Sequence, residues 1–469
     1  MGIAHSIVAD RRAATLPRMK RARQLVATLL AAAATLVVTA APVGTPPSVD
    51  DLAWSPMVGT VSSPLANSTV WSITVVGDDV YVGGAFTDFA GIAAADRIAK
   101  WNGSTNTWEA LAPAGATDGA ITAGTVYTIA VSGDVVYVGG RYTVDTGAVD
   151  CNNLTYFTIS TQTWAGFGDC PDAQLIPVNL TNSVYNIYAD ESGGSLYVGG
   201  NFASVNGDPL IAYAMVGQWS ACVGSVFTTC GASVPEVSVC GGVSVSCAVA
   251  VPNVWSPLGD NGSGGTALSD FVSTFAAHPD GGILVAGNFG GAGGVADANS
   301  NARYDSSLTP AWIAQDTPAV SMYGALRSGS DLYVSGWEGA YLRTAGNTWR
   351  SLCSTQLDIG GNTYGSMAVT GTGLLLVGGN SLFACDTAEG GQATEIESAT
   401  NVRAMANYRG AILVGGSALV GSGGDYIGVL GTLLPSTTTA DRQATQMLIL
   451  LTTLAAFTAL AGTQLLRRA

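Results

Sequence analysis

The chain has 469 residues, which fits two or three ordinary domains or one large domain built from repeats. Only 11% of the residues are charged and 61 are glycine, a balance that favours strands and tight turns over surface helices. Residues 42 to 441 hold 9 basic and 32 acidic side chains, a formal charge of −23 that repels phosphate backbones and anionic lipid headgroups. The composition therefore predicts a mostly β protein and excludes nucleic acid as a partner.

The N-terminal segment has the order of a secretory signal peptide. After Met19 come a basic cluster, an apolar run from Leu25 to Val38, and small residues around Ala40 and Ala41. The apolar run is short for a membrane span. We expect residues 1–41 to be a signal peptide, with Met19 as an alternative start. The pair at residues 11 and 12 leaves open a twin-arginine signal, although its surroundings give no support.

A short phrase returns along the rest of the chain and predicts a repeat. It is written DDVYVGGAF at residues 78 to 86 and returns as GDVVYVGGRY (133–142), GSLYVGGNF (194–202), GILVAGNF (282–289), DLYVSGW (331–337), LLLVGGN (374–380) and AILVGGS (411–417). The copies are mostly between the thirties and about sixty residues apart, the period of four-stranded propeller blades with variable loops. An alternating strand such as VWSITVVG (70–77) precedes the phrase, and a second hairpin such as RIAKWNGSTNTWEAL (97–111) follows it.

The glycine pair of the phrase indicates close packing between neighbouring sheets. Strand positions without side chains, such as Gly83 and Gly84, allow another backbone or a bulky ring to approach. An aromatic residue often follows within two positions, and we expect it to fill such gaps. These aromatic residues are Phe86, Tyr142, Phe202, Phe289 and Trp337.

Further aromatic residues complete a recognisable pattern. An aromatic residue lies some fifteen positions after the glycine pair and a tryptophan seven positions later, as in Trp101 with Trp108 and Phe157 with Trp164. Tyr304 with Trp312 stretches this spacing by one residue. The chain thus resembles the kelch-type propeller repeat, in particular the secreted cortical polarity-marker and galactose-oxidase-like class. The resemblance covers residues 51–433 and implies an all-β, seven-bladed β-propeller, but no particular activity, because this fold serves many functions.

The last repeat unit, residues 402 to about 433, is one strand short. The N-terminal stretch LAWSPM (52–57) resembles the closing strands VWSPLG (254–259) and TWEALA (107–112). We therefore expect Trp54 to Met57 to supply the missing strand, which joins both ends of the repeat region in one sheet and covers its edge.

Eight cysteines in an exported chain predict disulfides, although the sequence leaves their pairing open. Locality favours Cys151 with Cys170 and Cys353 with Cys385. The other four lie in an insertion at residues 220–254, where we expect a small loop that is closed by disulfides. These four are Cys222, Cys230, Cys240 and Cys247. A zinc site is the rival interpretation for these four, but their spacing lacks paired C-x-x-C motifs.

Little in the sequence points to catalysis. His278 is the only histidine after residue 41, and we interpret it as a turn residue. A copper site of the galactose-oxidase type needs two histidines. A sialidase-like site needs clustered arginines, whereas Arg97, Arg141 and Arg303 belong to different repeat units.

Carboxylates leave two further possibilities open. Asp78 and Asp79 could serve a glycosidase, but they fall in a hairpin turn, where Asp is expected for backbone reasons. The stretch GDNGSGG (259–265) is similar to a calcium loop without its alternating acids, so weak calcium binding stays open and no other cofactor is predicted.

Five N-x-[ST] motifs would carry glycans in a eukaryotic host. They are Asn67, Asn102, Asn153, Asn179 and Asn261.

The C-terminal segment is predicted to anchor the protein in a membrane. Residues 447–466 contain no charge and are long enough to span a bilayer as a helix, and Arg467 and Arg468 mark a short cytoplasmic tail at 467–469. Residues 434–446 form a linker. Its small residues also leave open a cell-wall sorting signal or a lipid-anchor signal.

These features favour a cell-surface, single-pass protein whose propeller is a non-catalytic binding or adhesion module for an extracellular protein or glycan. The alternatives are a surface glycan hydrolase that uses carboxylates and a structural envelope protein. Paired acids facing one pocket would favour the hydrolase, whereas an exposed aromatic patch on one face would favour binding.

Overall fold

A computed structural model of the protein describes most of the repeat region. The described residues lie between 52 and 433, with gaps at 56, 58–64, 114, 145–151, 167–182, 191–194, 202–215, 221–253, 259–267, 269, 296, 316–321, 345–347, 354–356, 358–364, 386–392, 398–400, 420–424 and 432. The predicted signal peptide, linker, membrane helix and tail lie outside this part of the chain. Within it, no helix is long and apolar enough to span a membrane.

The described residues form seven four-stranded antiparallel sheets, the number that the repeats predict. Sheet 1 contains β2 (Val70–Val76), β3 (Asp79–Gly84), β4 (Ile98–Asn102) and β5 (Thr107–Ala110), and sheet 2 contains β6 (Ile121–Ser132), β7 (Val135–Val144), β8 (Leu154–Thr158) and β9 (Thr163–Gly166). Sheet 3 contains β10 (Ser183–Asp190), β11 (Ser195–Asn201), β12 (Val216–Ser220) and β13 (Val254–Pro257), and sheet 4 contains β14 (Val272–Ala277), β15 (Ile283–Gly287), β16 (Asn301–Tyr304) and β17 (Trp312–Ala314). Sheet 5 contains β18 (Met322–Ser328), β19 (Asp331–Gly336), β20 (Gly339–Arg343) and β21 (Trp349–Cys353), and sheet 6 contains β22 (Ser366–Val369), β23 (Leu375–Gly378), β24 (Leu382–Cys385) and β25 (Ala393–Glu397). Sheet 7 contains β26 (Val402–Tyr408), β27 (Ala411–Leu419), β28 (Asp425–Leu430) and β1 (Trp54–Ser55).

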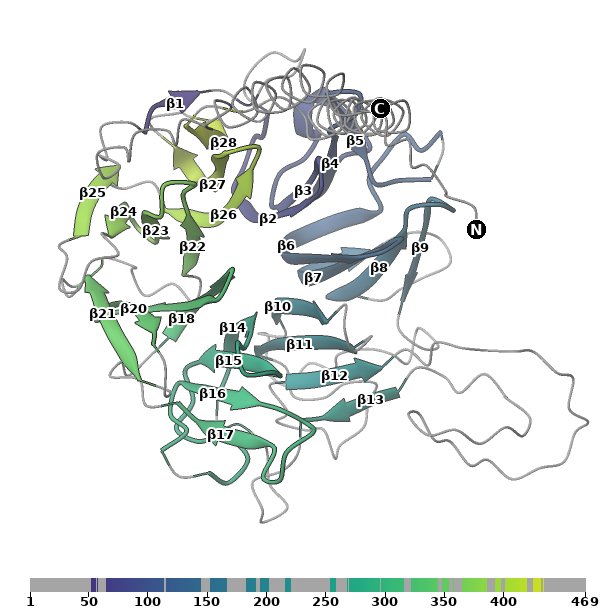
Figure 1. The fold of residues 1–469 in the computed structure, drawn as a ribbon. Helices are drawn as coiled ribbons and strands as arrows, with labels where there is room; N and C mark the ends of the chain where they lie inside the picture. The colour runs from purple at the N-terminus through teal and green to yellow at the C-terminus, as the bar shows by residue number, and fades with distance from the viewer. Residues whose placement is uncertain are drawn as a thin grey trace, which may run out of the picture. The chain divides into compact units, whose positions relative to one another are not determined.

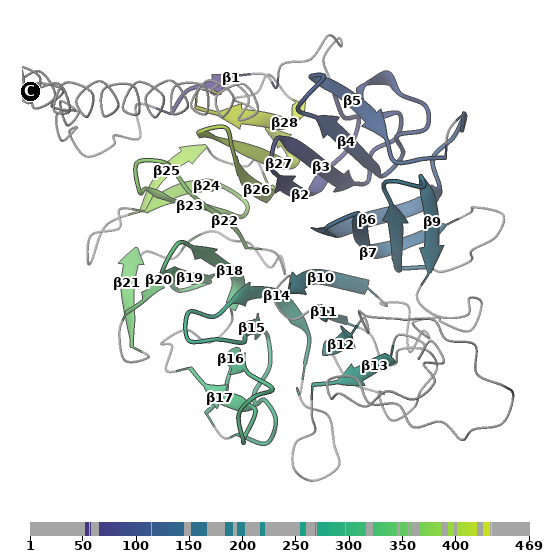
Figure 2. The ribbon, with the colours of Figure 1, turned by 45° about the vertical axis from the view of Figure 1, so that its right-hand side comes forward.

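The sheets follow one another in a closed ring, which is the arrangement of a β-propeller. Their first strands contact one another in an unbroken cycle: β2 with β6, β6 with β10, β10 with β14, β14 with β18, β18 with β22, β22 with β26, and β26 with β2. Figure 1 shows these strands nearest the centre, and Figure 2 shows the same order in a second view. Side-chain hydroxyls join neighbouring first strands, since Ser72 Oγ accepts from Ile129 N at 3.1 Å and Thr128 Oγ1 from Ile187 N at 3.1 Å.

The glycine pairs act as the sequence predicts. A Cβ atom at Gly83 would lie 2.6 Å from Val126 Cγ1 of the next sheet, and one at Gly199 would lie 2.7 Å from Val272 Cγ1. Real Cβ atoms essentially never come this close to a neighbour, so a side chain at either position would push adjacent sheets apart.

The ring closes as predicted, through a strand from the start of the repeat region. Trp54 pairs with Leu430 and Ser55 with Val429. The strand is shorter than expected, because it spans Trp54–Ser55 rather than Trp54 to Met57. The buried Asp425 side chain accepts a hydrogen bond from Leu65 N at 3.1 Å, which adds a second contact across the junction.

The tryptophan spacing also has a structural reason. The aromatic residues of each pair lie directly opposite each other on the third and fourth strands, as in Trp101 with Trp108 and Phe157 with Trp164. Trp164 Nε1 donates to Leu111 O at 3.0 Å, and Trp312 Nε1 donates to Leu258 O at 2.6 Å. Each of these acceptors follows the fourth strand of the preceding sheet, so the tryptophans connect neighbouring sheets.

One disulfide lies within the described residues. It joins Cys353 at the end of β21 to Cys385 at the end of β24, and thus sheet 5 to sheet 6 as predicted. The remaining candidate cysteines, Cys151, Cys170, Cys222, Cys230, Cys240 and Cys247, lie outside the described residues.

Each sheet is an antiparallel meander, so its connections lie at two opposite edges of the ring. We call turn edge the edge that carries the connections from first to second and from third to fourth strands. We call loop edge the edge that carries the connections from second to third strands and from one sheet to the next. β12 ends and β13 begins at the turn edge.

Candidate functional site

A β-bulge marks the start of the first strand in six of the seven sheets, at the loop edge. The bulge arises because one residue is skipped in the register with the second strand, and bulges of this kind re-aim a side chain. The skipped residues are Trp71, Tyr127, Tyr185, Ser273, Tyr323 and Arg403. Since the first strands are innermost, these side chains lie around the axis of the ring.

Four aromatic residues from consecutive sheets form a continuous run at this place. Trp71 packs on Tyr127 with ring centroids 5.2 Å apart, Tyr127 on Tyr185 at 6.1 Å, and Tyr185 on Phe271 at 6.0 Å. Phe271 lies directly before β14. All four side chains are half-buried. We call these four residues the aromatic rim.

Two arginines accompany the rim. The Arg403 guanidinium lies over the Trp71 ring, 4.9 Å from its centroid, which is cation–π geometry. Arg141 is exposed and pairs with Thr125 across the first hairpin of sheet 2, next to the Tyr127 bulge. Burial raises the pKa of both Tyr127 and Tyr185, and the positive charge of Arg141 acts on both in the opposite direction.

Trp337 adds an exposed aromatic side chain to the same edge. It is 47% exposed, whereas the aromatic residues that follow the second strand in three other sheets, Phe86, Tyr142 and Phe289, are at most 3% exposed. Trp337 stands one position earlier in its unit than these residues, because it directly follows Gly336, the counterpart of Gly84 and Gly140 in the strand register. The expectation that this aromatic residue fills a gap is therefore wrong for Trp337. Gly336 pairs with Gly339, so only Trp337 and Glu338 connect β19 to β20. This connection is too short to cover the indole ring of Trp337. Phe202 lies outside the described residues.

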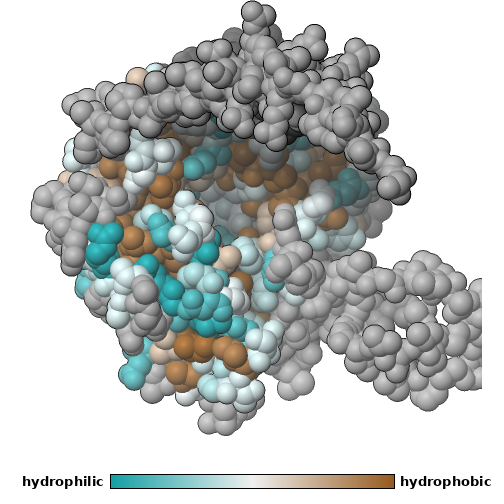
Figure 3. All heavy atoms as spheres, viewed as in Figure 1, coloured by the Kyte–Doolittle hydropathy of each residue, from teal (hydrophilic) through white to brown (hydrophobic). Residues whose placement is uncertain are grey.

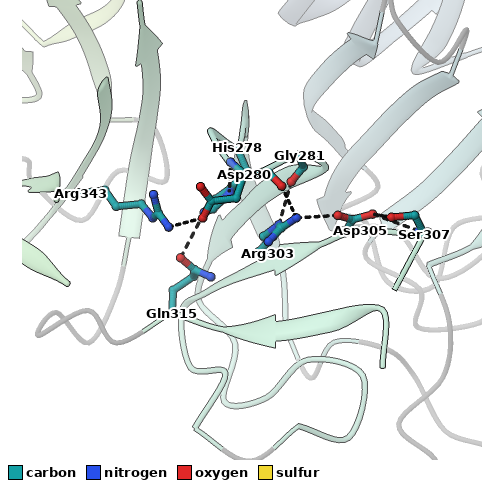
Figure 4. A network of polar contacts seen from close by, with 8 residues as sticks. All are labelled: His278, Asp280, Gly281, Arg303, Asp305, Ser307, Gln315 and Arg343. Carbon is teal, nitrogen blue, oxygen red and sulfur yellow. Dashed lines mark hydrogen bonds and ion pairs between the residues drawn. The ribbon is translucent and has the colours of Figure 1, made fainter. Parts of the chain in front are cut away.

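The turn edge has a different character, because its charged residues contact one another. In Figure 3, hydrophilic residues gather over β14, β15 and the sheet that follows. Figure 4 shows the polar network of this region, in which His278, Asp280 and Arg303 lie between Arg343 and Asp305.

His278 is a turn residue, as predicted. Its Nδ1 accepts a hydrogen bond from Asp280 N at 3.2 Å, and its Nε2 lies 3.4 Å from Gln315 Oε1. The ring is 5% exposed. Burial, and then the charges of Arg343 and Arg303, lowers the pKa of His278 to about 4. The neutral imidazole therefore holds the β14–β15 turn.

Arg303 and Arg343 are engaged in the same network. Arg303 donates to Gly281 O at 2.7 Å and forms an ion pair with Asp305 at 2.6 Å. Arg343, from sheet 5, forms an ion pair with Asp280 of sheet 4. Arg97 donates to Ala85 O at 2.9 Å within the loop of sheet 1. The arginines considered for a sialidase-like site thus belong to three separate sheets.

Asp78 and Asp79 also contact basic residues. Asp78 forms an ion pair with Arg409 at 3.2 Å, and Asp79 forms one with Lys100 at 2.8 Å. Asp79 Oδ1 in addition accepts from Gly103 N at 3.0 Å. Both carboxylates therefore stabilise the turn edge, and Asp78 joins sheet 1 to sheet 7.

One carboxyl pair lies at the loop edge, where sheet 1 meets sheet 2. Asp96 Oδ1 accepts a hydrogen bond from Asp88 N at 2.9 Å. Burial raises the pKa of the Asp96 carboxyl, the hydrogen bond from Asp88 N acts in the opposite direction, and the neighbouring Asp118 carboxyl raises the pKa further. A carboxyl with a raised pKa beside a second carboxyl suits proton transfer.

The predicted glycosylation sites and metal sites add little to this picture. Asn67 Nδ2 donates to Thr87 at 2.8 Å, Asn102 Nδ2 donates to Glu109 at 2.8 Å, and Asn153 Oδ1 accepts from Tyr142 N at 2.9 Å. Asn179, Asn261 and the stretch 259–265 lie outside the described residues. In the part of the chain that the structure describes, no group of three or more His, Cys, Asp or Glu residues could hold a metal ion.

The aromatic rim was missed at the level of sequence, although a signal for it exists. Trp71, Tyr127 and Tyr185 each directly follow a valine of the inner strand of their repeat unit. The alternation of apolar and polar residues predicts the strand, but it does not predict the bulge that moves these residues out of alternation.

Comparison with known proteins identifies no family. No protein-family model and no curated protein matches the chain. An extracellular domain of a one-component system from B. thetaiotaomicron is similar at TM-score 0.44 and 11% identity, over 81% of this chain and 40% of that one. An extracellular domain of a hybrid two-component system from the same organism reaches TM-score 0.45 and 12% identity, over 79% of this chain and 40% of that one. The computationally designed Ika8 protein reaches TM-score 0.39 and 11% identity, over 78% and 96%. This chain thus spans about two fifths of the bacterial structures, and similarity this distant carries no argument about function.

Proposed function

We propose that this protein is a cell-surface binding or adhesion module whose β-propeller takes an extracellular ligand at the loop edge, over the aromatic rim. The observation that supports the proposal is the run of four half-buried aromatic rings around the axis, from Trp71 to Phe271. Amphipathic aromatic side chains supply large contact areas and are enriched where proteins bind ligands. Trp337, exposed on the same edge, extends the available aromatic surface.

The contrast with the turn edge favours binding over catalysis. The charged residues there form ion pairs with one another, as Asp78 does with Arg409 and Asp280 with Arg343. Carboxylates engaged in this way have structural partners in place of a substrate. The kelch-type assignment remains part of this proposal and depends on the repeat pattern of residues 51–433.

Export and anchoring complete the proposal. The predicted signal peptide at residues 1–41 and the predicted membrane helix at residues 447–466 would hold the ring outside the cell.

The proposal is tested with the full chain, purified in a mild detergent, on glycan and protein arrays. Trp71→Ala should weaken binding to the captured ligand by tenfold or more, a typical loss for a central aromatic contact. Tyr156→Ala is the matched control, because Tyr156 is a half-buried aromatic residue of sheet 2 that packs on Tyr137 away from the rim. Absence of any ligand, or equal binding by wild type and Trp71→Ala, would contradict the proposal.

A second candidate function is a surface glycan hydrolase, which the Asp96–Asp118 pair favours because it combines a raised pKa with a neighbouring carboxylate. Asp96→Asn should then reduce the release of sugar reducing ends from a polysaccharide panel by about 100-fold or more. Asp134→Asn is the control, since Asp134 accepts from Ser160 N at the turn edge. A wild-type protein that releases no reducing ends eliminates this candidate.

A further inference from the structure

The positive charge at the aromatic rim is unusual for this chain. Residues 42 to 441 carry 32 acidic and only 9 basic side chains. Four of these basic residues form ion pairs at or near the turn edge: Lys100, Arg303, Arg343 and Arg409. Two others, Arg141 and Arg403, lie beside the rim at the loop edge, where the exposed carboxylate of Asp270 also lies, next to Phe271.

Arg141 is placed by an extension of one hairpin. β6 has 12 residues and β7 has 10, and their pairing continues past the bulge through Thr125 with Arg141 and Ile121 with Val144. This hairpin is visible as β6 and β7 in Figure 1. In the described part of the chain no carboxylate forms an ion pair with Arg141. Arg141 is therefore exposed at the loop edge, on the strand that pairs with β6 beside the Tyr127 bulge.

Arg403 places a positive charge at the Trp71 end of the aromatic rim. It is the bulged residue of β26, and its guanidinium covers Trp71 at 4.9 Å from the ring centroid. Its Nη2 also lies 3.4 Å from Asn401 Oδ1, which holds the side chain from a second side. A positive group that already occupies the face of Trp71 disfavours a cationic ligand at this place and favours an anionic one.

We propose that the ligand of the loop edge is a saccharide that carries a carboxylate, a uronic-acid type of sugar. Arg141 binds the carboxylate, since a guanidinium matches its two oxygens with two parallel hydrogen bonds. The rings of Tyr127 and Tyr185 pack against the apolar face of the sugar, and Arg403 keeps the neighbouring surface positive. This inference rests on the proposed binding function and narrows its ligand class.

The test uses the full chain in detergent with two matched probes, tetragalacturonate and its fully methyl-esterified form, which differ in the charge of the carboxyl groups. The acid should bind at least tenfold more tightly than the ester. Arg141→Gln should weaken binding of the acid by about tenfold and leave binding of the ester unchanged. Arg327→Gln, a strand arginine that donates to Gly329 O near the turn edge, should change neither.

Equal affinity for acid and ester, or an Arg141→Gln variant that binds the acid like wild type, overturns the inference. A sulfated oligosaccharide that binds while tetragalacturonate does not bind also overturns it, because it assigns the site to a different anion. If neither galacturonate probe binds but another array ligand is lost on Trp71→Ala, this inference fails and the proposed function stands. If no array ligand depends on Trp71, the proposed function itself fails.

Discussion

The two edges of the ring differ in how their charged and aromatic side chains are engaged. At the turn edge, acids and bases of neighbouring sheets form ion pairs, and the one described histidine holds a turn. At the loop edge, aromatic rings remain partly exposed and Arg141 projects from an extended hairpin. The difference teaches that residues which look reactive in the sequence can be structural, while the proposed binding surface consists of residues that look like ordinary strand positions.

Sheets 1 and 5 show the same contrast in the aromatic residues that follow their second strands. Phe86 is fully buried beneath the loop that leads to β4, and its ring lies 4.7 Å from that of Phe89. Trp337 stands one position earlier in its unit, forms a two-residue connection with Glu338, and is 47% exposed. The position of the aromatic residue and the length of the connection both differ between the two sheets, and together they separate a core ring from a surface ring.

The largest expected effect comes from truncating the buried member of this pair. Phe86→Ala removes a fully buried ring that packs on Phe89, so we expect it to lower the free energy of unfolding by about 4 kcal/mol. Urea denaturation followed by tryptophan fluorescence measures this loss. A loss below about 1 kcal/mol would mean that the loop of sheet 1 does not hold this ring in a packed core.

The ion pair between sheets 1 and 7 should be nearly as important. Asp78→Ala leaves Arg409 with a guanidinium whose side chain is only 9% exposed and without its carboxylate, which costs about 3 kcal/mol of stability. Binding at the loop edge should not change. The double variant Asp78→Ala/Arg409→Leu should recover part of the stability, and absence of any recovery would argue that Asp78 acts through its other contacts.

The stability of the turn edge should depend on pH through His278. Its pKa is lowered from 6.5 to about 4 in the folded protein, so the unfolded chain binds a proton first as the pH falls. Stability is therefore complete above about pH 6.5 and decreases by about 2–3 kcal/mol as the pH falls to about 4. The measurement compares wild type with His278→Asn across this range, and parallel pH profiles would show that the histidine contributes nothing.

The smallest expected change in stability belongs to the exposed ring. Trp337→Ala should alter the free energy of unfolding by less than about 0.5 kcal/mol, as is usual for exposed positions. If Trp337 belongs to the ligand surface, the same variant should weaken ligand binding measurably. A large loss of stability would place this ring in a packed environment instead.

The fold could be predicted from the sequence because its determinants are local and repeated. The glycine pairs, the opposed aromatic residues such as Trp101 and Trp108, and the sheet-completing strand at Trp54 all follow from patterns within one repeat unit or from a missing strand. The pairing of Cys353 with Cys385 followed from locality in the same way.

The candidate site could not be predicted as far, because its contacts join residues that are distant in the chain. Arg409 reaches Asp78 across 331 positions, and Trp101 Nε1 donates to the hydroxyl of Tyr408 across 307. The aromatic rim likewise collects one residue from each of four units. Only the closed ring brings such residues together, and bulges in the first strands re-aim three of the four rim side chains, those of Trp71, Tyr127 and Tyr185.

Sheet 7 is built like its neighbours except that the backbone is interrupted where the others have the turn between third and fourth strands. Gly431 N donates to Ala53 O at 2.8 Å, so the two sides of this interruption already touch. A short linker between these residues, with new termini opened at the turn after Gly133, would give a circular permutant with all 28 strands in the same places. The geometry of the ring therefore does not require the chain to begin and end in sheet 7, and the same break could lie in any of the seven sheets.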